Sequence, residues 1–337
     1  MYVGISPVRI SLAGGGTDMP EYYEKYGGSV VSSSISLFTY LMIKSRNDNA
    51  FQAFSTDFKI HHYKTNFEKL KAKSGTEIVV SVIKHLGFKK GTDFIIGSDV
   101  QPGSGLGASS SLTVNLVNVI SKLQKKHFSQ KTIAEKAFFV ERNILSHPIG
   151  KQDDYIASFG GLNYIKFTKN NTTVTPIRLK KSKSEELQNN LLLFFIGTTR
   201  KSSSVLSKQL TKTKNLNPTT INSLHKVNDL SKDLFKVLKK SDLTQVGRIL
   251  NEGWSEKKKF TSQVSNPKID KIYENAIKKG ASGGKLTGAG AGGHMLFYCE
   301  KEKQNAVKNE MKRLGLKHID FNFYKNGPKI LNLYDFI

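Results

Sequence analysis

The sequence predicts an α+β fold in two closely joined parts. Segments with strand periodicity and segments with helix periodicity are mixed along the chain, without the strict alternation that a doubly wound parallel sheet requires. The chain has 337 residues, which is enough for one large domain or two ordinary ones. A polar, basic stretch at 180–186 marks the expected junction, so we predict domains over residues 1–180 and 181–337.

In the first half, strands are expected over 2–12, around 35–43 and over 93–100, and helices from 108 to about 123 and over 129–146. Two further strands are expected over 161–168 and 172–178. These predictions depend on apolar periodicity, carried by Ile35, Leu37, Leu41 and Ile43 in the second strand and by Leu112, Leu116, Val119, Ile120 and Leu123 in the first helix.

The second half begins with a short buried strand over 191–197 and is then helical almost throughout 202–262. Another helix opens at Pro267, because proline is favoured in the first helical turn. Its apolar stripe consists of Ile269, Ile272, Tyr273, Ala276 and Ile277. A glycine-rich segment, a strand over 294–299, a helix and a last pair of strands complete the chain.

Composition and cysteine usage exclude several classes of protein. No run of about 18 apolar residues is present, so a membrane-spanning helix is not expected. Cys299 is the only cysteine, which excludes intrachain disulfides and cysteine-based zinc sites. Residues 1–7 lack the basic region and apolar stretch of a secretory signal, so we expect a cytoplasmic protein.

The net charge of +25 has two interpretations. One is a polyanionic partner such as nucleic acid. The other is a surface kept soluble by lysine. Only seven of the 52 basic residues are arginines, the residues that read bases and phosphates by bidentate hydrogen bonds, and the lysines form short scattered clusters such as 257–259. We therefore favour the second interpretation and expect no nucleic-acid partner. A small anionic substrate would benefit from the field in either case.

The strongest functional signal is Gln-Pro-Gly-Ser-Gly-Leu-Gly-Ala-Ser-Ser-Ser at 101–111. Alternating glycines let the backbone bend closely around a ligand, and the helix that follows directs its N–H groups and dipole at that ligand. Phosphate is the ligand that this arrangement fits best. Serines 109–111 are available to cap the helix or to bind a metal. The alternative is an ordinary loop with an N-cap. The segment is neither a Walker loop nor a dinucleotide fingerprint.

A second signal is Pro-Val-Arg-Ile-Ser-Leu-Ala-Gly-Gly-Gly-Thr-Asp at 7–18. Arg9 lies inside an otherwise apolar strand, and a buried arginine needs an anionic partner. Asp18 follows a glycine turn, where its carboxylate can accept hydrogen bonds from sugar hydroxyls. The alternative for Asp18 is an ordinary Asx-type turn.

The third signal covers 141–161. Glu141 continues an apolar helical stripe, and a carboxylate in that place must be paired, protonated or metal-bound. One glutamate, one serine and a nearby aspartate base would suffice for Mg²⁺-assisted phosphoryl transfer. We favour Asp153 as the functional aspartate and interpret Asp154 as part of a solvated helix start.

The fourth signal is Gly-Gly-Lys-Leu-Thr-Gly-Ala-Gly-Ala-Gly-Gly at 283–293, with six glycines in eleven residues. Such a density requires close backbone approach or positive φ. A second glycine-rich loop this far along the chain suggests that both halves surround one ligand. Lys285, inside the loop, either contacts a phosphate or is simply exposed.

Together these four segments resemble the GHMP kinase family, which includes galactokinase and homoserine, mevalonate and phosphomevalonate kinases. The resemblance extends from Pro7 to Gly293. Segment 102–110 is similar to the family's ATP loop, and segment 283–293 to its C-terminal glycine motif. Within the family, Leu-Ala-Gly-Gly-Gly-Thr-Asp, Gly-Lys-Gln-Asp-x-Tyr and Thr-Thr-Arg look most like the D-glycero-D-manno-heptose 7-phosphate kinase group.

The resemblance implies an N-terminal domain of ribosomal-S5-like type and a ferredoxin-like C-terminal domain, with the site between them. It implies ATP and Mg²⁺ as cofactors, a small sugar phosphate as substrate and the possibility of a homodimer. The implied roles are as follows: Asp153 and Arg9 are catalytic; Pro102, Gly103, Ser104, Gly105, Leu106, Gly107, Ala108, Ser109 and Ser110 bind ATP; Ser109 and Glu141 bind Mg²⁺; Gly15, Gly16, Thr17, Asp18, Arg200, Gly288, Ala289 and Gly290 bind the acceptor.

The acceptor itself is the open part of the interpretation. Gly15 and Gly16 replace the Glu-His of galactokinase, which argues against galactose. For a phosphorylated sugar a second basic cluster must hold the distal phosphate, and Arg200 with Lys201 are the candidates, with Lys151 a weaker one. We expect phosphorylation of the anomeric hydroxyl of the heptose 7-phosphate. The alternatives are a kinase of the same fold for a fucose-like or galactose-like sugar or an isoprenoid alcohol, and a sugar and ATP sensor without turnover.

Overall fold

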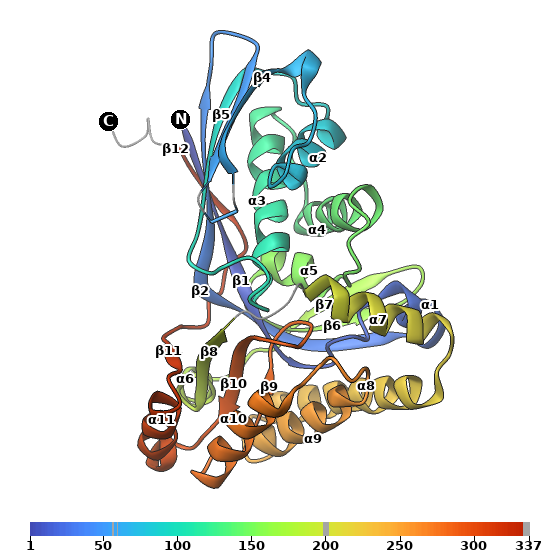
Figure 1. Cartoon of the computed structure of the whole chain (residues 1–337), viewed down its shortest axis with the longest axis vertical. Helices are drawn as coiled ribbons and strands as arrows, with labels where there is room; N and C mark the ends of the chain where they lie inside the picture. Colours follow the sequence, from blue (N-terminus) through green and yellow to red (C-terminus); the bar gives the residue numbers. More distant parts are fainter. Residues whose placement is uncertain (56, 59, 198–201, 333–337) are drawn as a thin grey trace.

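A computed structural model of the chain describes residues 1–55, 57–58, 60–197 and 202–332. Two sheets organise the fold (Figure 1). The first has the order β12-β1-β2-β5-β3-β4, and β6 also pairs with β2 and β7 with β6. Its strands are β1 (Tyr2–Ala13), β2 (Gly28–Ser45), β3 (Ala50–Ser55), β4 (Ile60–Asn66), β5 (Thr92–Ser98), β6 (Leu162–Phe167), β7 (Thr172–Pro176) and β12 (Lys329–Asn332). Its strand pairings are antiparallel apart from β3 with β5.

Helices from the first half of the chain lie together on one side of this sheet (Figure 1). They are α2 (Glu77–Leu86), α3 (Ala108–Leu123), α4 (Gln130–Phe139), a π-helical turn (Val140–Ile144) and α5 (Gln152–Phe159), while α1 (Pro20–Tyr26) connects β1 to β2. The apolar stripe predicted for the first helix faces the sheet, where Leu116 and Val119 of α3 share a core with Leu41 and Ile43 of β2. A 3₁₀ turn, Phe67–Lys69, follows β4.

The second sheet has the order β11-β8-β10-β9 and is antiparallel. Numbered along the chain, its strands have the order 4-1-3-2 of a ferredoxin-like fold. The strands are β8 (Leu191–Gly197), β9 (Gly283–Leu286), β10 (Gly293–Tyr298) and β11 (Lys317–Ile319). The helices of this half are α6 (Lys181–Asn189), α7 (Ser202–Lys214), α8 (Pro218–Lys239), α9 (Val246–Lys258), α10 (Pro267–Lys278) and α11 (Gln304–Arg313), the last preceded by a 3₁₀ turn (Lys301–Lys303).

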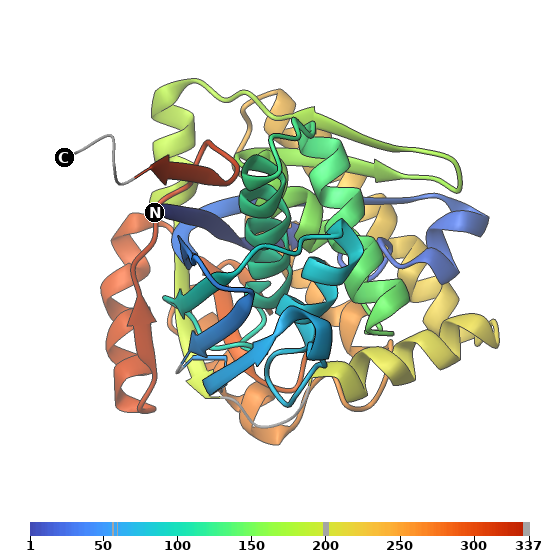
Figure 2. The same ribbon diagram turned by 90° about the horizontal axis from the view of Figure 1, so that it is seen from above.

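The two halves lie one above the other in Figure 1 and overlap in the view of Figure 2, and a shared contact surface joins them. Helices α8 and α9 contact β1, and one apolar core contains Val8 and Ile10 of β1 together with Leu234 of α8 and Ile249 of α9. Buried polar contacts cross the same surface, as Ser29 Oγ donates to Asn228 Oδ1 at 2.7 Å. Residues in the second half of β1 are therefore fixed relative to both halves, which is what a shared site requires.

The α+β prediction and the helical 202–262 region are confirmed, and several details differ. The sequence interpretation missed β3, β4 and α2, which extend the first sheet and cover it. The last two strands do not pair with each other, because β11 joins β8 whereas β12 returns to β1 in the first sheet. Ile277 was expected on the buried stripe of α10 but is 37% exposed. The domain boundary at 180/181 stays a prediction.

Candidate active site

The loop at 101–107 leads directly into α3, and its glycines have positive φ. The N-cap of α3 is Gly107 at φ +77°, and no side chain caps the helix. Of the two roles left open for serines 109–111, helix capping is therefore not found; Ser111, for example, donates instead to Ser6 O at 3.0 Å. The first N–H groups of a 16-residue helix remain available at a glycine cradle, and this arrangement fits a phosphate.

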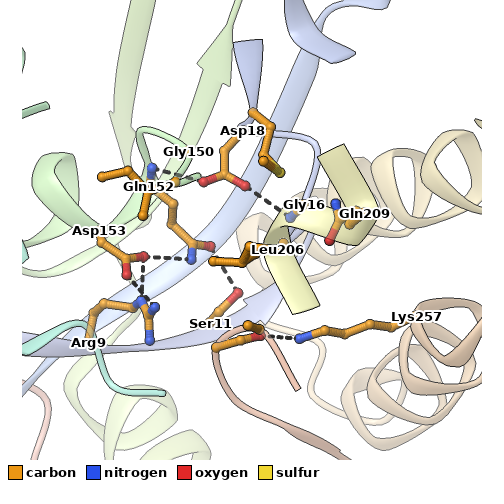
Figure 3. Close-up of a pocket in the computed structure, with 15 residues that line it drawn as sticks. Arg9, Ser11, Gly16, Asp18, Gly150, Gln152, Asp153, Leu206, Gln209 and Lys257 are labelled. Carbon is orange, nitrogen blue, oxygen red and sulfur yellow. Dashed lines mark hydrogen bonds and ion pairs between the residues drawn. The ribbon is translucent and has the colours of Figure 1, made fainter. Parts of the chain in front are cut away.

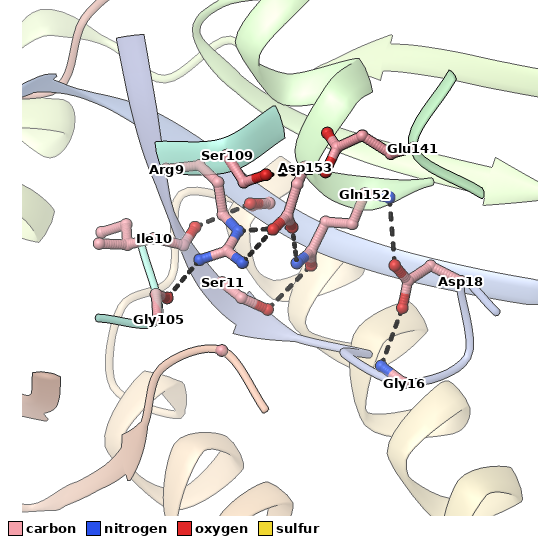
Figure 4. A network of polar contacts seen from close by, with 12 residues as sticks. Arg9, Ile10, Ser11, Gly16, Asp18, Gly105, Ser109, Glu141, Gln152 and Asp153 are labelled. Carbon is pink, nitrogen blue, oxygen red and sulfur yellow. Dashed lines mark hydrogen bonds and ion pairs between the residues drawn. The ribbon is translucent and has the colours of Figure 1, made fainter. Parts of the chain in front are cut away.

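Ser109, in the first turn of α3, contacts the buried Glu141 of the π-helical turn (Figure 4). The serine hydroxyl donates to Glu141 Oε2 at 2.9 Å, and His147 Nδ1 lies 3.6 Å from the same oxygen. Glu141 is only 1% exposed, and its Oε1 has no hydrogen-bond partner among the described residues. The Ser109 hydroxyl and the Glu141 carboxylate, with its unpartnered Oε1, form a set of oxygen ligands that fits a Mg²⁺ ion bound partly by phosphate oxygens.

Arg9 has the anionic partner that its burial required, and that partner is Asp153 (Figure 4). The guanidinium of Arg9 holds the carboxylate at both ends, with Nε 2.7 Å from Oδ1 and a second nitrogen 2.5 Å from Oδ2. The remaining terminal nitrogen donates at 2.5 Å to Gly105 O of the loop at 101–107, which is called the phosphate loop below after the ligand predicted for it. Gln152 Nε2 adds a 3.2 Å hydrogen bond to Asp153. A planar, bidentate pair of this kind fixes the direction in which Asp153 points.

Asp18 is a second carboxylate near Asp153, and it is held by backbone N–H groups. Its carboxylate accepts hydrogen bonds from Gly16 N at 2.9 Å and Gln152 N at 3.1 Å. The contact with Gly16 is the local turn that was the alternative interpretation, and the contact with Gln152 ties the turn to α5. Burial, followed by the nearby Asp153, raises the pKa of Asp18.

One pocket brings Arg9, Asp18 and Asp153 together with residues of the second half of the chain (Figure 3), whereas Ser109 and Glu141 do not line it. Its volume is about 80 Å³, and α7 forms part of its wall through Leu206 and Gln209. The lining residues are Arg9, Ser11, Gly15, Gly16, Asp18, Met19, Ile149, Gly150, Gln152, Asp153, Leu206, Gln209, Lys257, Gly288 and Ala289. The glycine loop at 283–293 thus reaches the same site as the phosphate loop.

Two family models match the chain. The GHMP kinases N terminal domain matches residues 74–161, and the GHMP kinases C terminal matches residues 234–316. The chain is also 32% identical, over 96% of its length and 97% of the relative's, to D-glycero-alpha-D-manno-heptose 7-phosphate kinase of Campylobacter jejuni. The chain belongs to the GHMP kinase family. It is accordingly an ATP-dependent phosphotransferase with an alcohol group as acceptor.

Solved structures of GHMP kinases share the whole fold. The crystal structure of a D-glycero-D-manno-heptose 1-phosphate kinase from Bacteroides thetaiotaomicron is similar with a TM-score of 0.82 and 26% identity, over 98% of this chain and 99% of that one. A putative sugar kinase from Campylobacter jejuni has a TM-score of 0.80 and 30% identity, over 98% of both chains. The two-domain GHMP kinase fold expected from the motifs is therefore confirmed.

The GHMP kinase structure corrects two sequence interpretations. Asp154 is not part of a solvated helix start, because it is fully buried and neither of its carboxylate oxygens has a partner among the described residues. Burial, followed by the negative charge of Glu141, raises the pKa of Asp154 well above its ordinary value. Lys285 is 5% exposed, which excludes the exposed alternative.

Other predicted residues have different surroundings from those expected. Thr17 is buried, and its hydroxyl bonds to Gly14 O and Ser29 O rather than facing the pocket. Gly290 is packed against Val264. Arg200 and Lys201 lie outside the described residues. The roles proposed for them in acceptor binding stay predictions.

Eight residues of the pocket were missed from the sequence, and three of them, Gln152, Gln209 and Lys257, bring polar groups that bear on the chemistry of the site. Gln152 orients both Asp18 and Asp153, and its only signal was its position beside Asp153. Gln209 is 3% exposed and its Nε2 has no partner among the described residues. Lys257 had a usable signal, because it continues the apolar spacing of Val246, Leu250 and Trp254 along α9 and is therefore buried.

Proposed function

We propose that this GHMP kinase uses Mg²⁺ and ATP to phosphorylate the anomeric hydroxyl of D-glycero-D-manno-heptose 7-phosphate, giving the 1,7-bisphosphate. The observation that carries the proposal is the Arg9–Asp153 pair, which lies in a pocket formed by both halves and borders the phosphate loop. The 32% identity to a heptose 7-phosphate kinase supports the choice of acceptor.

In the proposed reaction Asp153 is the base. Its carboxylate is held by Arg9, is about a quarter exposed and faces the pocket, so an acceptor hydroxyl can donate to it. The hydroxyl oxygen forms a bond to the γ-phosphorus of ATP while the bond between that phosphorus and the β,γ-bridging oxygen breaks. The hydroxyl proton passes to Asp153, and ADP leaves with the electron pair.

Charge neutralisation is the other task of the site. Arg9 contacts both Asp153 and the phosphate loop, so its guanidinium lies where negative charge develops during transfer. Ser109 and Glu141 would hold Mg²⁺, which would neutralise phosphate oxygens when bound. Asp18 and Gln209, at the far side of the pocket, would accept from and donate to hydroxyls of the acceptor.

The most specific part of the proposal is the position of the phosphate group that the acceptor already carries. The curated relative is named as a 7-phosphate kinase, whereas the solved relative at 26% identity is named as a 1-phosphate kinase. The higher identity favours the 7-phosphate.

A cytoplasmic location belongs to the same proposal, since ATP is a cytoplasmic substrate. No helix among the described residues is long and apolar enough to cross a membrane. A homodimer stays a prediction.

The proposal is tested by ADP release from purified protein with Mg-ATP and a panel of acceptors. The panel contains manno-heptose 7-phosphate, manno-heptose 1-phosphate, mannose 6-phosphate, fucose, galactose and mevalonate. We expect turnover with the 7-phosphate. Turnover only with the 1-phosphate, with a plain sugar or with mevalonate would keep the kinase and discard this acceptor. ATP binding without turnover on any acceptor would favour the sensor alternative.

The Asp153→Asn variant tests the assignment of the base. We expect kcat to fall by about 10²–10⁴-fold, the usual contribution of a general base, while ATP still binds. Arg9 keeps a partner in the amide oxygen, so the fold should survive. ATP affinity by titration calorimetry and the melting temperature check both points, and unchanged kcat in the folded variant would reject Asp153 as the base.

A further inference from the structure

Two lysines are buried beneath the second glycine-rich loop. Lys257 of α9 is 7% exposed and Lys285 of β9 is 5% exposed. Buried lysines are rare without a charged partner, because an ammonium ion loses its hydration on burial. These two therefore need an explanation that the Arg9–Asp153 pair does not supply.

The contacts of the two lysines are with backbone carbonyl groups. Lys257 Nζ donates to Gly288 O and lies 3.4 Å from Leu286 O, and Lys285 Nζ lies 3.5 Å from Leu12 O. Among the described residues neither ammonium forms an ion pair with a carboxylate, although other buried charges such as Arg9 do. Burial, with Arg9 as the second cause, lowers the pKa of Lys257 to about 8. Asp18 and Asp153 raise this pKa from a distance, but no carboxylate among the described residues lies within ion-pair distance of the Lys257 ammonium.

Lys257 lines the pocket on the side of the second loop (Figure 3). That loop touches the phosphate loop directly, since a Cβ on Gly288 would lie 2.5 Å from the Cα of Gly105. Gly105 O is also the atom to which Arg9 donates. Arg9 and Lys257 thus approach the end of the phosphate loop from the two halves of the chain.

We propose that Lys257 is a second cation for the phosphoryl group in transfer. Its ammonium donates to oxygens of the γ-phosphoryl while Arg9 neutralises the group from the other side. Lys257 takes part in no covalent step; the bonds and the proton move as in the proposed kinase reaction, on which this inference rests.

An acceptor phosphate is the other phosphoryl anion that could meet this ammonium. The structure favours the transferred group for a geometric reason. Lys257 is bound to Gly288 O, and Gly288 is packed on the phosphate loop, whereas the acceptor's hydroxyls are expected at Asp18 and Gln209. In the proposed reaction the attacking hydroxyl lies at Asp153, so a phosphate at the opposite end of the acceptor would lie away from the phosphoryl group in transfer.

The test is Lys257→Met, with Lys258→Met as its matched control. Methionine keeps the length and removes the charge, and replacing a desolvated cation by an apolar side chain should not unfold the protein. Lys258 is the next residue on the same helix, but it is exposed and pairs with Asp270 at 3.3 Å. Melting temperatures of both variants establish that they are folded.

Steady-state kinetics with manno-heptose 7-phosphate and equilibrium binding of ATP and ADP are then measured. We expect Lys257→Met to lower kcat by about 10²–10³-fold, the loss found when one donor to a developing charge is removed. We also expect it to weaken ATP binding more than ADP binding, with little change in the acceptor KM. Lys258→Met should match the wild type.

Two results would overturn the inference. One is unchanged kcat together with an unchanged preference for ATP over ADP. The other is a raised KM for the 7-phosphate at unchanged kcat, which would assign Lys257 to the acceptor's own phosphate. Failure of the kinase proposal looks different, because the wild type would then have no turnover to lose, and the ATP and ADP affinities would still report on Lys257.

Discussion

The two glycine-rich loops of the site touch each other, yet the ionisable side chains buried beside them are acidic at the first loop and basic at the second. The first loop opens α3, and near it lie the buried carboxylates of Glu141 and Asp154, with three oxygens that have no partner among the described residues. The second loop joins β9 to β10, and beneath it lie the buried ammonium groups of Lys257 and Lys285.

This difference shows that similar glycine patterns can have different tasks. The first loop presents helix N–H groups, which suit a phosphate, and adjoins carboxylates, which suit a metal ion. The second loop has no helix after it; it uses its carbonyl groups to hold Lys257 and its glycines to approach the first loop. The acidic side of the site therefore suits a cation and the basic side suits an anion, and Mg-ATP contains both.

The largest effect expected from breaking the contact between the loops comes from Gly288→Ala. A methyl group there would lie 2.5 Å from Gly105 Cα, and φ of +67° adds strain, so the loops must separate. We expect kcat/KM for ATP to fall by about 100-fold or more, equivalent to roughly 3 kcal/mol. Steady-state kinetics with varied ATP measures it.

Gly315→Ala is the control for backbone strain alone. Its φ is +76°, but its Cβ would meet no atom within 4 Å, and the residue lies at the end of α11 away from the pocket. We expect a stability cost of about 1 kcal/mol and wild-type kinetics. If both variants lost activity equally, the contact between the loops would not be the cause.

The sequence was sufficient for the features that have a local signal. The phosphate loop, the exact limits of β8 and the helices after residue 202 follow from periodicity and glycine spacing. The buried Arg9 and Glu141 were also recognised, because each interrupts an apolar pattern. A charged residue within such a pattern must be buried with a partner, so the pattern predicts both burial and function.

What the sequence could not give depends on contacts between distant residues. Asp153 and Arg9 are 144 positions apart, and only the fold shows that they pair. Asp154 looked solvated because it adjoins a helix start, whereas α3 and α4 cover α5. For Lys257 the apolar spacing along α9 indicates burial, but only the fold shows that the side chain lines the pocket and is bound to Gly288 O of the second loop. In each case tertiary packing, rather than local chemistry, decided the role.

A smaller effect, the pH dependence of kcat/KM for ATP, tests the role of Lys257 beneath the second loop. The groups that face Lys257 are Arg9, which lowers its pKa, and Asp18 and Asp153, which raise it. Lys285 is nearby, and burial, followed by Lys257, lowers its own pKa well below the ordinary value. With a pKa of about 8 in the free enzyme, Lys257 loses its charge above pH 8. We expect kcat/KM for ATP to fall up to tenfold per pH unit there, and this fall should be missing in Lys257→Met.

Stability should change in the opposite direction over the same range. Because the unfolded chain binds the proton more tightly than the folded one, Lys257 destabilises the fold below pH 8, and this penalty disappears between pH 8 and about 10.4. Lys257→Met should therefore be more stable than wild type at pH 7, with the difference shrinking as the pH rises. Urea titrations at several pH values measure it, and a constant difference would contradict it.

The smallest effect concerns the carboxylate side and the variant Asp154→Asn. Burial and Glu141 raise the pKa of Asp154, so the folded chain binds its proton more tightly than the unfolded chain does. The fold is free of this penalty below about pH 4 and is increasingly destabilised as the pH rises toward the folded-state pKa. The amide has the same shape and no charge, so we expect Asp154→Asn to melt a few degrees above wild type at pH 7 and equally at pH 4.

Thermal melting in metal-free buffer tests this, with Asp233→Asn as the control. Asp233 lies on α8 and is 53% exposed in a pair with Lys236, so its substitution should change the melting temperature little at either pH. If Asp154→Asn melted below wild type at pH 7, the carboxylate would be satisfied in the folded protein, and the two sides of the site would not be opposite in the way proposed. If added Mg²⁺ stabilised the wild type more than the variant, Asp154 would contribute negative charge to the Glu141 site, and the contrast between the two loops would become stronger.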